Sequence, residues 1–280
     1  MTKLLLVDGM NLFFQMFFGM PARILNAQGK AVQGTLGFVG ALIKIIRWTE
    51  PTHLAVLFDG EHPNPRAALD DGYKANRVDY AAVPEEQNPF SQLGDVYAAL
   101  RFLKIRHAEL TEWETDDVIA GYTDRYGKEA DIVIASWDSD FFQLIGENVR
   151  VLRYRGKQSV LCDSAYVEER FGVPPSRYAA FKSLTGDKAD NILGAEMVGA
   201  KTAAALLQQF GSLEEIIRRA DQIAKPSVGA SIRRNAERLR INYQLIRLEN
   251  RGSLPFSLEE LVCAYDGAAT RQVLQGIGLG

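Results

Sequence analysis

The chain has 280 residues, of which 47% are hydrophobic, and its formal net charge at pH 7 is −3. This apolar content can build a sizeable core and argues against wholesale disorder, while the overall charge does not by itself indicate a nucleic-acid binder. No apolar stretch approaches the roughly 18 residues of a transmembrane helix, the N-terminal run is too short for a signal peptide, and the two cysteines form no metal-binding spacing. We therefore expect a cytoplasmic protein without a membrane partner.

The first half of the chain alternates strand-like and helix-like patterns. Three short apolar runs each end in an acidic residue: residues 4–8, 53–59 and 132–138. Uninterrupted runs of this length are typical of strands buried on both faces. Helical patterns at residues 37–50 and 95–105 lie between them, which predicts a parallel α/β sheet. Functional crevices of such sheets lie at the carboxyl ends of the strands, so Asp8, Asp59 and Asp138 should meet at one edge.

Beyond residue 170 the pattern becomes helical, with glycine-bearing turns and no clear strand except near residues 254–264. We predict an α/β domain over residues 1–170 and a helical domain over residues 171–280. The segment "KPSVGAS" (225–231) is expected to be a loop between helices. Residues 218–251 carry nine basic and three acidic side chains, which favours contact with a phosphate backbone.

Further acidic residues lie downstream of the first two strand ends. Glu114, Asp116 and Asp117 precede a helical pattern, and Asp187 and Asp190 lie in a turn-like segment. Acids complement the positive end of a helix, so capping is an equally good interpretation of the first cluster. The second cluster, taken alone, is typical of a turn.

With Asp8, Asp59, Asp138 and Asp140, the chain offers nine such carboxylates. If they converge, close pairs repel by several kcal/mol at an effective dielectric constant of about 20, so the cluster must take up protons or cations. Oxygen ligands without His or Cys favour Mg²⁺ or Mn²⁺. More carboxylates than one ion can use indicates two ions, about 3.5–4 Å apart in phosphodiester-cleaving enzymes.

Several motifs occur in an order that resembles the 5′ nuclease family: "LLLVDGMNL", "YKANR", "ETDD", "WDSDFFQL" and "GDKADNILGAEMVGAKTA". That family includes flap endonucleases, phage 5′→3′ exonucleases and the 5′-nuclease domain of bacterial DNA polymerase I. The resemblance covers about residues 3–220. It implies an α/β, PIN-like nuclease core with a parallel sheet and a helical arch (about residues 66–95), followed by an all-α helix–three-turn–helix DNA-binding module.

The resemblance also implies the reaction and the metal ligands. The expected activity is two-metal hydrolysis of DNA phosphodiesters at junctions between single strand and duplex, as a 5′→3′ exonuclease and flap endonuclease. Four acids match the first metal site of the family: Asp8, Asp59, Glu114 and Asp116. Four match the second site: Asp138, Asp140, Asp187 and Asp190. Asp117 matches an acid near both ions, and Asp138 a ligand close to both.

The "YKANR" motif lies where the family's arch begins. Lys74 and Arg77 are three residues apart and would share one face of a helix. Facing the metals, they would stabilise charge on the scissile phosphate, so we expect both to be catalytic. By the same resemblance Tyr73 would stack on a base and Arg66 would contact a phosphate. The alternative is an exposed helix with ordinary charges.

The segment after residue 194 predicts a turn that leads into a helix. Backbone N–H groups near Gly199, together with Lys201 and Thr202, can bind a DNA phosphate at the helix start. In the family this module also binds K⁺ through main-chain carbonyls. Here Met197 replaces a glycine of the usual turn, which puts the turn geometry and the K⁺ site in question.

Two other functions are compatible with parts of this pattern. A PIN-like ribonuclease has a similar acidic pocket, but the "GDKADNILG" segment and the basic helical module argue against it. A non-catalytic scaffold for DNA junctions is the other alternative, and the nine acids argue against it, because clustered unpaired carboxylates destabilise a protein unless ions are bound. The expected partner is DNA with 5′ flaps or 5′ ends, or an RNA primer, and the expected state is a monomer.

Overall fold

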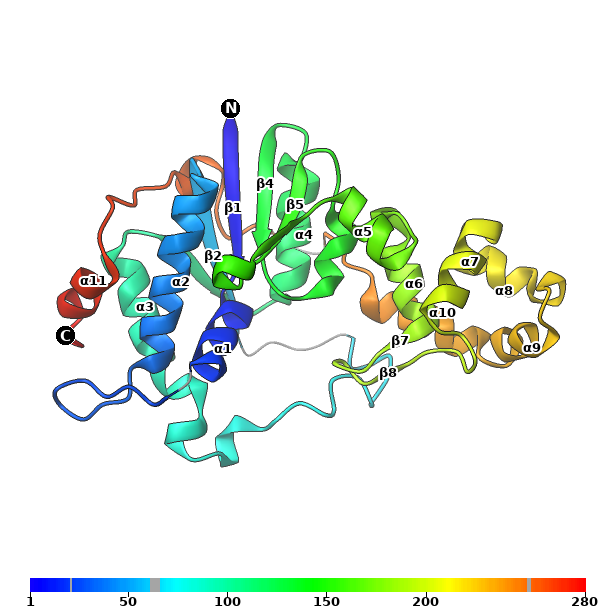
Figure 1. Cartoon of the computed structure of the whole chain (residues 1–280), viewed down its shortest axis with the longest axis horizontal. Coiled ribbons are helices and arrows are strands. Elements are labelled where there is room, and N and C mark those ends of the chain that lie inside the picture. Colours follow the sequence, from blue (N-terminus) through cyan, green and yellow to red (C-terminus); the bar gives the residue numbers. More distant parts are fainter. Residues whose placement is uncertain (21, 61–65, 251–252) are drawn as a thin grey trace.

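The computed structural model describes residues 1–20, 22–60, 66–250 and 253–280, and it is built around a six-stranded sheet (Figure 1). The strands are β1 (Thr2–Asp8), β2 (His53–Asp59), β3 (Arg106–Leu110), β4 (Ala130–Ala135), β5 (Val149–Arg153) and β6 (Val160–Cys162). Their order is β3-β2-β1-β4-β5-β6, and every neighbouring pair is parallel except β5 and β6. The expected parallel α/β sheet is confirmed.

The α-helices divide between the faces of the sheet and a separate helical part. They are α1 (Gly9–Gly19), α2 (Gln33–Thr49), α3 (Leu93–Phe102), α4 (Thr115–Tyr126), α5 (Ser164–Phe171), α6 (Tyr178–Thr185), α7 (Ala200–Phe210), α8 (Leu213–Arg218), α9 (Pro226–Arg234), α10 (Ala236–Ile246) and α11 (Thr270–Gly276). Short 3-10 helices are η1 (Tyr80–Ala82), η2 (Glu85–Gln87), η3 (Pro89–Gln92), η4 (Ser139–Leu144), η5 (Gly156–Gln158), η6 (Pro175–Arg177), η7 (Ala220–Gln222) and η8 (Glu259–Leu261). None of the helices found among the described residues is long and apolar enough to cross a membrane.

Alternate residues of β1 belong to two hydrophobic cores, one on each face of the sheet. Leu5 and Val7 pack with residues of α1, α2, α3 and α11, whereas Leu4 and Leu6 pack with α4 and the helical part. Both faces of the strand are therefore covered, which explains why its sequence is a continuous apolar run.

The order of strands reverses between β1 and β4, which are neighbours in the sheet. A crevice at the carboxyl ends of the strands is expected at such a switch point. β4 ends at Ala135 rather than at residue 138, because Asp138 caps η4 with a side chain that accepts a hydrogen bond from the Asp140 N–H. The aspartates at 138 and 140 consequently lie just beyond the strand, in a short helical turn.

The predicted arch segment differs from expectation. Among residues 66–92 the structure shows turns and the 3-10 helices η1, η2 and η3, and no α-helix. Lys74 has φ +58°, which a right-handed helix does not allow, so the prediction that Lys74 and Arg77 share a helix face is wrong. Pro84 and Pro89 further interrupt any continuous helix, because proline restricts the residue before it.

The helical part contains one small sheet and one helix where a loop was expected. β7 (Gly186–Asp187) and β8 (Ile192–Leu193) form an antiparallel hairpin that the sequence did not predict. The segment 225–231 begins α9 instead of forming a loop, because Pro226 occupies the first helical position, where proline is well tolerated.

The last part of the chain returns to the α/β part, at the left of Figure 1, away from the helices α7–α9. Cys263 donates its N–H to the Thr52 carbonyl at 2.8 Å, and Val262 forms a bridge with His53. Val273 of α11 is buried in the core with α2 and α3. The expected division, with all of residues 171–280 in the helical domain, therefore does not hold for this terminal segment.

Candidate active site

The first group of acidic side chains lies at the carboxyl ends of β1 and β2. Asp8 is the last residue of β1 and is only 5% exposed; its carboxylate accepts hydrogen bonds from the Asn11 N–H (3.0 Å) and the Ser136 hydroxyl (2.9 Å). Asp59 ends β2 and accepts the Thr115 N–H at 2.8 Å. This bond fixes the start of α4, which carries Asp116 and Asp117, against the same edge of the sheet.

The acids of this edge influence one another strongly. Burial, and then the charges of Asp59 and Asp138, raise the pKa of Asp8 to about 7. Burial, followed by the charges of Asp138, Asp8 and Asp59, raises the pKa of Asp116 well above its ordinary value. Such carboxylates hold protons or bind cations near neutral pH, because their negative charges are close together and poorly solvated.

A second group is formed by Asp140, Asp187 and Asp190, each of which offers one carboxylate oxygen within 4.8 Å of the others. Burial raises the pKa of Asp140 to about 7, and the Asp138 charge adds to this shift. Because Asp138 also raises the pKa of Asp8 and Asp116, its carboxylate acts on both groups.

The hairpin β7–β8 holds two of these acids in place. A Cβ atom on Gly194 would lie 2.5 Å from the Gly186 nitrogen and 2.4 Å from the Thr185 carbonyl carbon, so only glycine fits. Gly186 itself has φ +80°, a conformation that glycine adopts readily. The glycines of the "TGDKADNILG" segment thus let the chain turn tightly enough to place Asp187 and Asp190 beside Asp140.

Lys182 of α6 is a member of this site that the sequence reasoning missed. It is 6% exposed, and its ammonium group contacts the carboxylates of both Asp140 and Asp187. Although burial opposes it, the charges of Asp140, Asp138 and Asp187 raise the pKa of Lys182. A lysine within the mostly apolar run "YAAFKSL", five residues before an aspartate, was the available signal.

Glu114 and Asp117 form ion pairs with cationic side chains. Lys74 contacts Glu114 at 2.8 Å, and Arg66 contacts both Glu114 and Asp117, the latter at 2.7 Å. Although burial opposes it, Lys74 and Arg66 lower the pKa of Glu114. Asp117 also accepts a hydrogen bond from the Glu249 N–H at 3.2 Å, so its carboxylate is bound by Arg66 and by the backbone.

Arg66 and Tyr73 occupy different surroundings from those expected. Arg66 is 2% exposed and also donates to the Arg247 carbonyl at 3.1 Å, so it holds acids in place instead of presenting its guanidinium to a phosphate. Tyr73 is 8% exposed and packs with Ile192 and Leu245, which removes its ring from a surface where a base could stack. Arg66 is buried because it pairs with two carboxylates, and Tyr73 is buried because it packs against apolar side chains.

The turn that carries Lys74 and Arg77 docks on the hairpin of the second acidic group. The Lys74 N–H donates to the Asp190 carbonyl at 3.0 Å, and Arg77 contacts the Asp190 carboxylate at 3.2 Å. Asn191 donates to the Gly72 carbonyl at 2.8 Å. The two basic residues are therefore close to the acids even though no helix carries them.

The turn before α7 keeps a left-handed residue despite the missing glycine. Met197 has φ +65°, a strained backbone conformation for a residue with a side chain, and it is exposed. Gly199 caps α7 with an extended backbone, Lys201 is exposed and Thr202 is half-exposed. The N-terminus of α7 is thus open to an anion.

The donor set of the two groups fits hard divalent cations. All the donors are carboxylates, and no described His or Cys accompanies them in the cluster around Asp140. A mostly parallel sheet, acids at its carboxyl edge and flanking Lys and Arg residues are together typical of metal-dependent enzymes that act on phosphate esters.

Family models identify the chain within that class. The model described as "5′-3′ exonuclease, N-terminal resolvase-like domain" matches residues 3–172, and "5′-3′ exonuclease, C-terminal SAM fold" matches residues 173–268. The chain therefore belongs to the 5′-3′ exonuclease family of metal-dependent nucleases, which confirms the resemblance seen in its motifs.

Curated relatives are DNA polymerases. DNA polymerase I of Rhizobium leguminosarum is 35% identical over 268 residues, covering 92% of this chain and 26% of the relative. The thermostable DNA polymerase I of Thermus filiformis is 33% identical over 258 residues, covering 92% of this chain and 29% of the relative. The chain thus spans less than a third of the length of these two relatives.

Two solved structures share the fold. The bacteriophage T5 5′-exonuclease with bound zinc has a TM-score of 0.71 at 22% identity, covering 87% of this chain and 89% of that one. A T5 flap endonuclease in a pseudo-enzyme-product complex with DNA and metal ions has a TM-score of 0.71 at 22% identity, covering 98% and 97%.

Proposed function

We propose that the protein is a structure-specific 5′ nuclease that hydrolyses DNA phosphodiesters where a single strand joins a duplex. It acts as a 5′→3′ exonuclease and as a flap endonuclease, with two Mg²⁺ or Mn²⁺ ions. The observation that carries the proposal is the meeting of two acidic groups at one sheet edge, with Asp138 raising the pKa of acids in both.

The residues that would hold the ions follow the two groups. Asp8, Asp59, Glu114 and Asp116 would hold the first ion, and Asp138, Asp140, Asp187 and Asp190 the second. When bound, two divalent cations stabilise charge on the attacking and the leaving oxygens of a phosphodiester. We assign Asp117 a positioning role, because it fixes Arg66, which in turn holds Glu114.

Cationic side chains complete the site. The Lys74 ammonium, held by Glu114, and the exposed Arg77 guanidinium lie beside the acids and would neutralise the scissile phosphate. Lys182 supplies positive charge between Asp140 and Asp187. Together these groups orient a phosphate whose negative charge the acids alone would repel.

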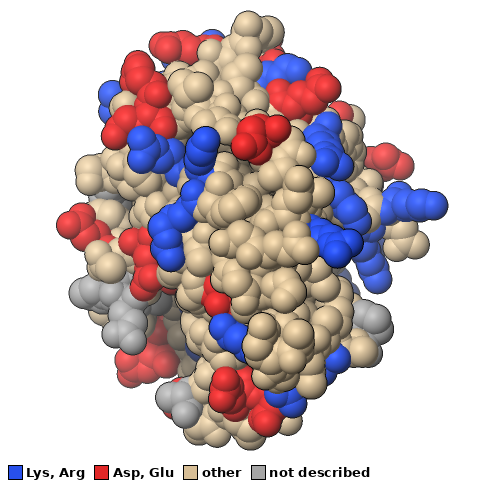
Figure 2. All heavy atoms as spheres, turned by 90° about the vertical axis from the view of Figure 1, so that its left-hand side faces the viewer, with Lys and Arg blue, Asp and Glu red and all other residues tan. Residues whose placement is uncertain are grey.

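The helical part would hold the duplex. Gly199, Lys201 and Thr202 at the start of α7 would bind a backbone phosphate, and the basic residues of α9 and α10 would extend the contact. Arg251 belongs to the same basic stretch but lies outside the described residues. The opposite end of the molecule, which carries α11, shows basic and acidic groups around a broad uncharged centre (Figure 2). The described residues of that face do not form the continuous basic surface that a phosphate backbone would need.

The remaining parts of the proposal concern the cation of the turn, the substrate and the compartment. Met197 keeps a left-handed backbone conformation in the turn before α7, which supports a K⁺ site in this turn. The test is whether the affinity for DNA depends on K⁺.

We include RNA primers with a 5′ end among the substrates. We also propose that the protein acts as a monomer. The thiols of Cys162 and Cys263 are free, as expected in the cytoplasm.

The test uses a 5′-labelled flap duplex with Mg²⁺ or Mn²⁺ and an Asp138→Asn/Asp140→Asn variant. We expect cleavage at the junction that requires the metal and disappears in the variant. Asp266→Asn, which changes an exposed acid far from the site in sequence, is the control and should cleave normally. Binding of the flap by the wild-type protein without cleavage in either metal would overturn the proposal and favour a scaffold.

A further inference from the structure

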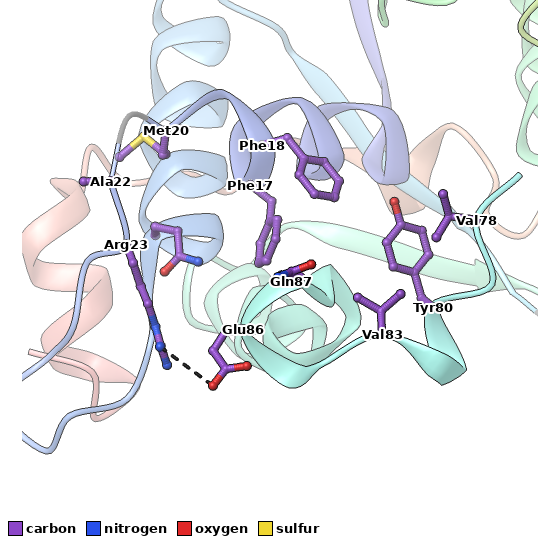
Figure 3. A pocket seen from close by; sticks show the side chains of 11 residues that line it. Phe17, Phe18, Met20, Ala22, Arg23, Val78, Tyr80, Val83, Glu86 and Gln87 are labelled. Atoms are coloured by element: carbon purple, nitrogen blue, oxygen red, sulfur yellow. Dashed lines mark ion pairs between the residues drawn. The ribbon is translucent and has the colours of Figure 1, made fainter.

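A cavity of about 440 Å³ lies between the C-terminal half of α1 and the segment that follows the Lys74–Arg77 turn. Phe17 and Phe18 of α1 form one wall, and Tyr80 and Val83 form the other (Figure 3). This volume is in the range of sites that bind small ligands or single nucleotides. The acids described above do not line it.

The walls are built from aromatic rings. The ring centroids of Phe17 and Phe18 are 5.1 Å apart, and those of Phe18 and Tyr80 are 6.4 Å apart with a tilt of 31°. Phe18 is 56% exposed, which is unusual for a side chain that belongs to an aromatic cluster. Exposed rings of this kind provide platforms on which nucleobases stack without regard to sequence.

One polar group in the pocket has no partner. Gln33, the first residue of α2, lines the cavity and is 5% exposed, and its Oε1 accepts no hydrogen bond in the described part of the chain. A buried acceptor without a donor destabilises a folded protein, so a turn of the Gln33 amide that brings this oxygen to a hydrogen-bond donor of a ligand in the cavity would be favoured. The exocyclic amino groups of adenine, cytosine and guanine are such donors.

The rim supplies charge. Arg23 and Glu86 face each other across the mouth at 4.0 Å, and both side chains are about half exposed (Figure 3). A pair this loose is worth little, so the Arg23 guanidinium can turn to a phosphate at small expense. The pocket therefore combines the three features of a nucleotide site: rings, a hydrogen-bond acceptor and a nearby cation.

The cavity lies along the same helix, α1, that begins at the acidic edge of the sheet. Phe17 follows Asp8 by nine residues along α1, and at 1.5 Å per residue this is roughly 13 Å. A stacked strand advances about 3.4 Å per nucleotide, so about four nucleotides would span this length of α1. The far wall, residues 78–87, directly continues the turn with Lys74 and Arg77 that docks on Asp190.

We propose that this pocket binds one unpaired nucleobase of the strand being hydrolysed, about four nucleotides from the scissile bond. Phe18 and Tyr80 stack on the base, Gln33 accepts a hydrogen bond from it, and Arg23 contacts its phosphate. The inference rests on the proposed function, because it takes the ligand from a single-stranded flap.

The experiment measures binding in Ca²⁺, so that it does not depend on cleavage. Flap duplexes carry 2-aminopurine at one unpaired position at a time, from the first to the eighth. We expect a fluorescence change that peaks near the fourth position and is lost in Phe18→Ala, with restoration in Phe18→Trp. Trp48→Ala, which removes a 50% exposed ring at the other end of α2, is the matched control and should behave as wild type.

An abasic site at the peak position provides the second measurement. It should weaken binding by the wild-type protein about tenfold and binding by Phe18→Ala very little, because the ring and the base act as a pair. Gln33→Leu, which keeps the side-chain size, should bind amino-bearing bases and thymine equally well at that position. A change of the same size at every position, or an equal abasic loss in both proteins, would overturn the inference.

The outcomes separate the pocket from the enzyme. Cleavage of flaps with a position-independent signal would refute the pocket alone. A position-dependent signal without cleavage in Mg²⁺ or Mn²⁺ would refute the nuclease and leave the pocket standing. If Phe18→Ala leaves the signals intact and instead lowers the sedimentation coefficient, the pocket is a contact between copies of the chain and the inference fails.

Discussion

Replacing Lys182 by methionine tests the electrostatics of the second acidic group. Lys182 is buried, and its ammonium contacts Asp140 and Asp187. Removing one partner of a buried ion pair costs about 3–5 kcal/mol, because the remaining charge has no compensation. At about 2–3 °C per kcal/mol for a chain of this size, the melting temperature in EDTA should fall by roughly 6–15 °C.

Divalent cations should reverse much of this loss. In Lys182→Met the acids of the second group can bind a cation without competition from the ammonium. A ligand at 100 times its dissociation constant stabilises by about 2.7 kcal/mol. We therefore expect 10 mM Mg²⁺ to raise the melting temperature of the variant more than that of the wild type, and calorimetry to show tighter Mg²⁺ binding at one site.

The assay is thermal unfolding followed by circular dichroism, in EDTA and in Mg²⁺, for wild type, Lys182→Met and Lys44→Met. Lys44 is exposed on α2, so the Lys44→Met control removes the same charge without breaking a buried ion pair. A loss of less than 2 °C for Lys182→Met in EDTA, or a loss of equal size with and without Mg²⁺, would refute the reasoning.

Three further predictions concern the acids and the turns. Burial raises the pKa of Asp8 in the folded protein to about 7, above its ordinary value. Protonation of Asp8 therefore stabilises the folded state fully below about pH 4, and this contribution to stability is lost as the pH rises through about 7. In EDTA the melting temperature should thus decline between pH 5 and pH 8, and it should decline less steeply in the Asp8→Asn variant. Identical slopes of melting temperature against pH in the two proteins would contradict the raised pKa of Asp8. Met197→Gly should stabilise by about 0.5–1 kcal/mol in urea unfolding, because φ +65° strains a side chain; an unchanged midpoint would argue against strain. Gly194→Ala should weaken Mg²⁺ binding at least tenfold in calorimetry, because a Cβ would meet the Gly186 backbone; normal binding would show that the hairpin tolerates it.

The sheet and the position of its strand-end acids could be predicted because local sequence dictates them. Continuous apolar runs must be buried on both faces, and parallel strands bring their carboxyl ends to one edge. This pattern alone predicts the positions of Asp8 and Asp59 at the carboxyl edge of the sheet. Asp187 and Asp190 were found through motifs, and glycines at 186 and 194 explain why that motif turns as it does.

What the sequence did not reveal depends on contacts between distant segments. Arg66 and Tyr73 are buried because α4 and α10 supply carboxylates and apolar side chains far away in the sequence. From the sequence alone, Lys182 is a single charged residue in an apolar helix. Its role becomes visible only in the structure, where Asp140 lies beside it. The turn at Lys74 is stabilised by the Asp190 carbonyl, an interaction that a helical pattern cannot indicate.

The return of the chain to the α/β part has a mechanical consequence. The helical segment departs after β6 and comes back where Cys263 bonds to Thr52, so it is anchored at both ends to one body. A unit on a single tether can swivel freely, whereas a unit on two tethers can only rock about the line that joins them. The distance between the N-terminus of α7 and the acidic edge of the sheet should then change little as the helical segment rocks. A duplex bound at the start of α7 would therefore reach the acids at a set number of base pairs.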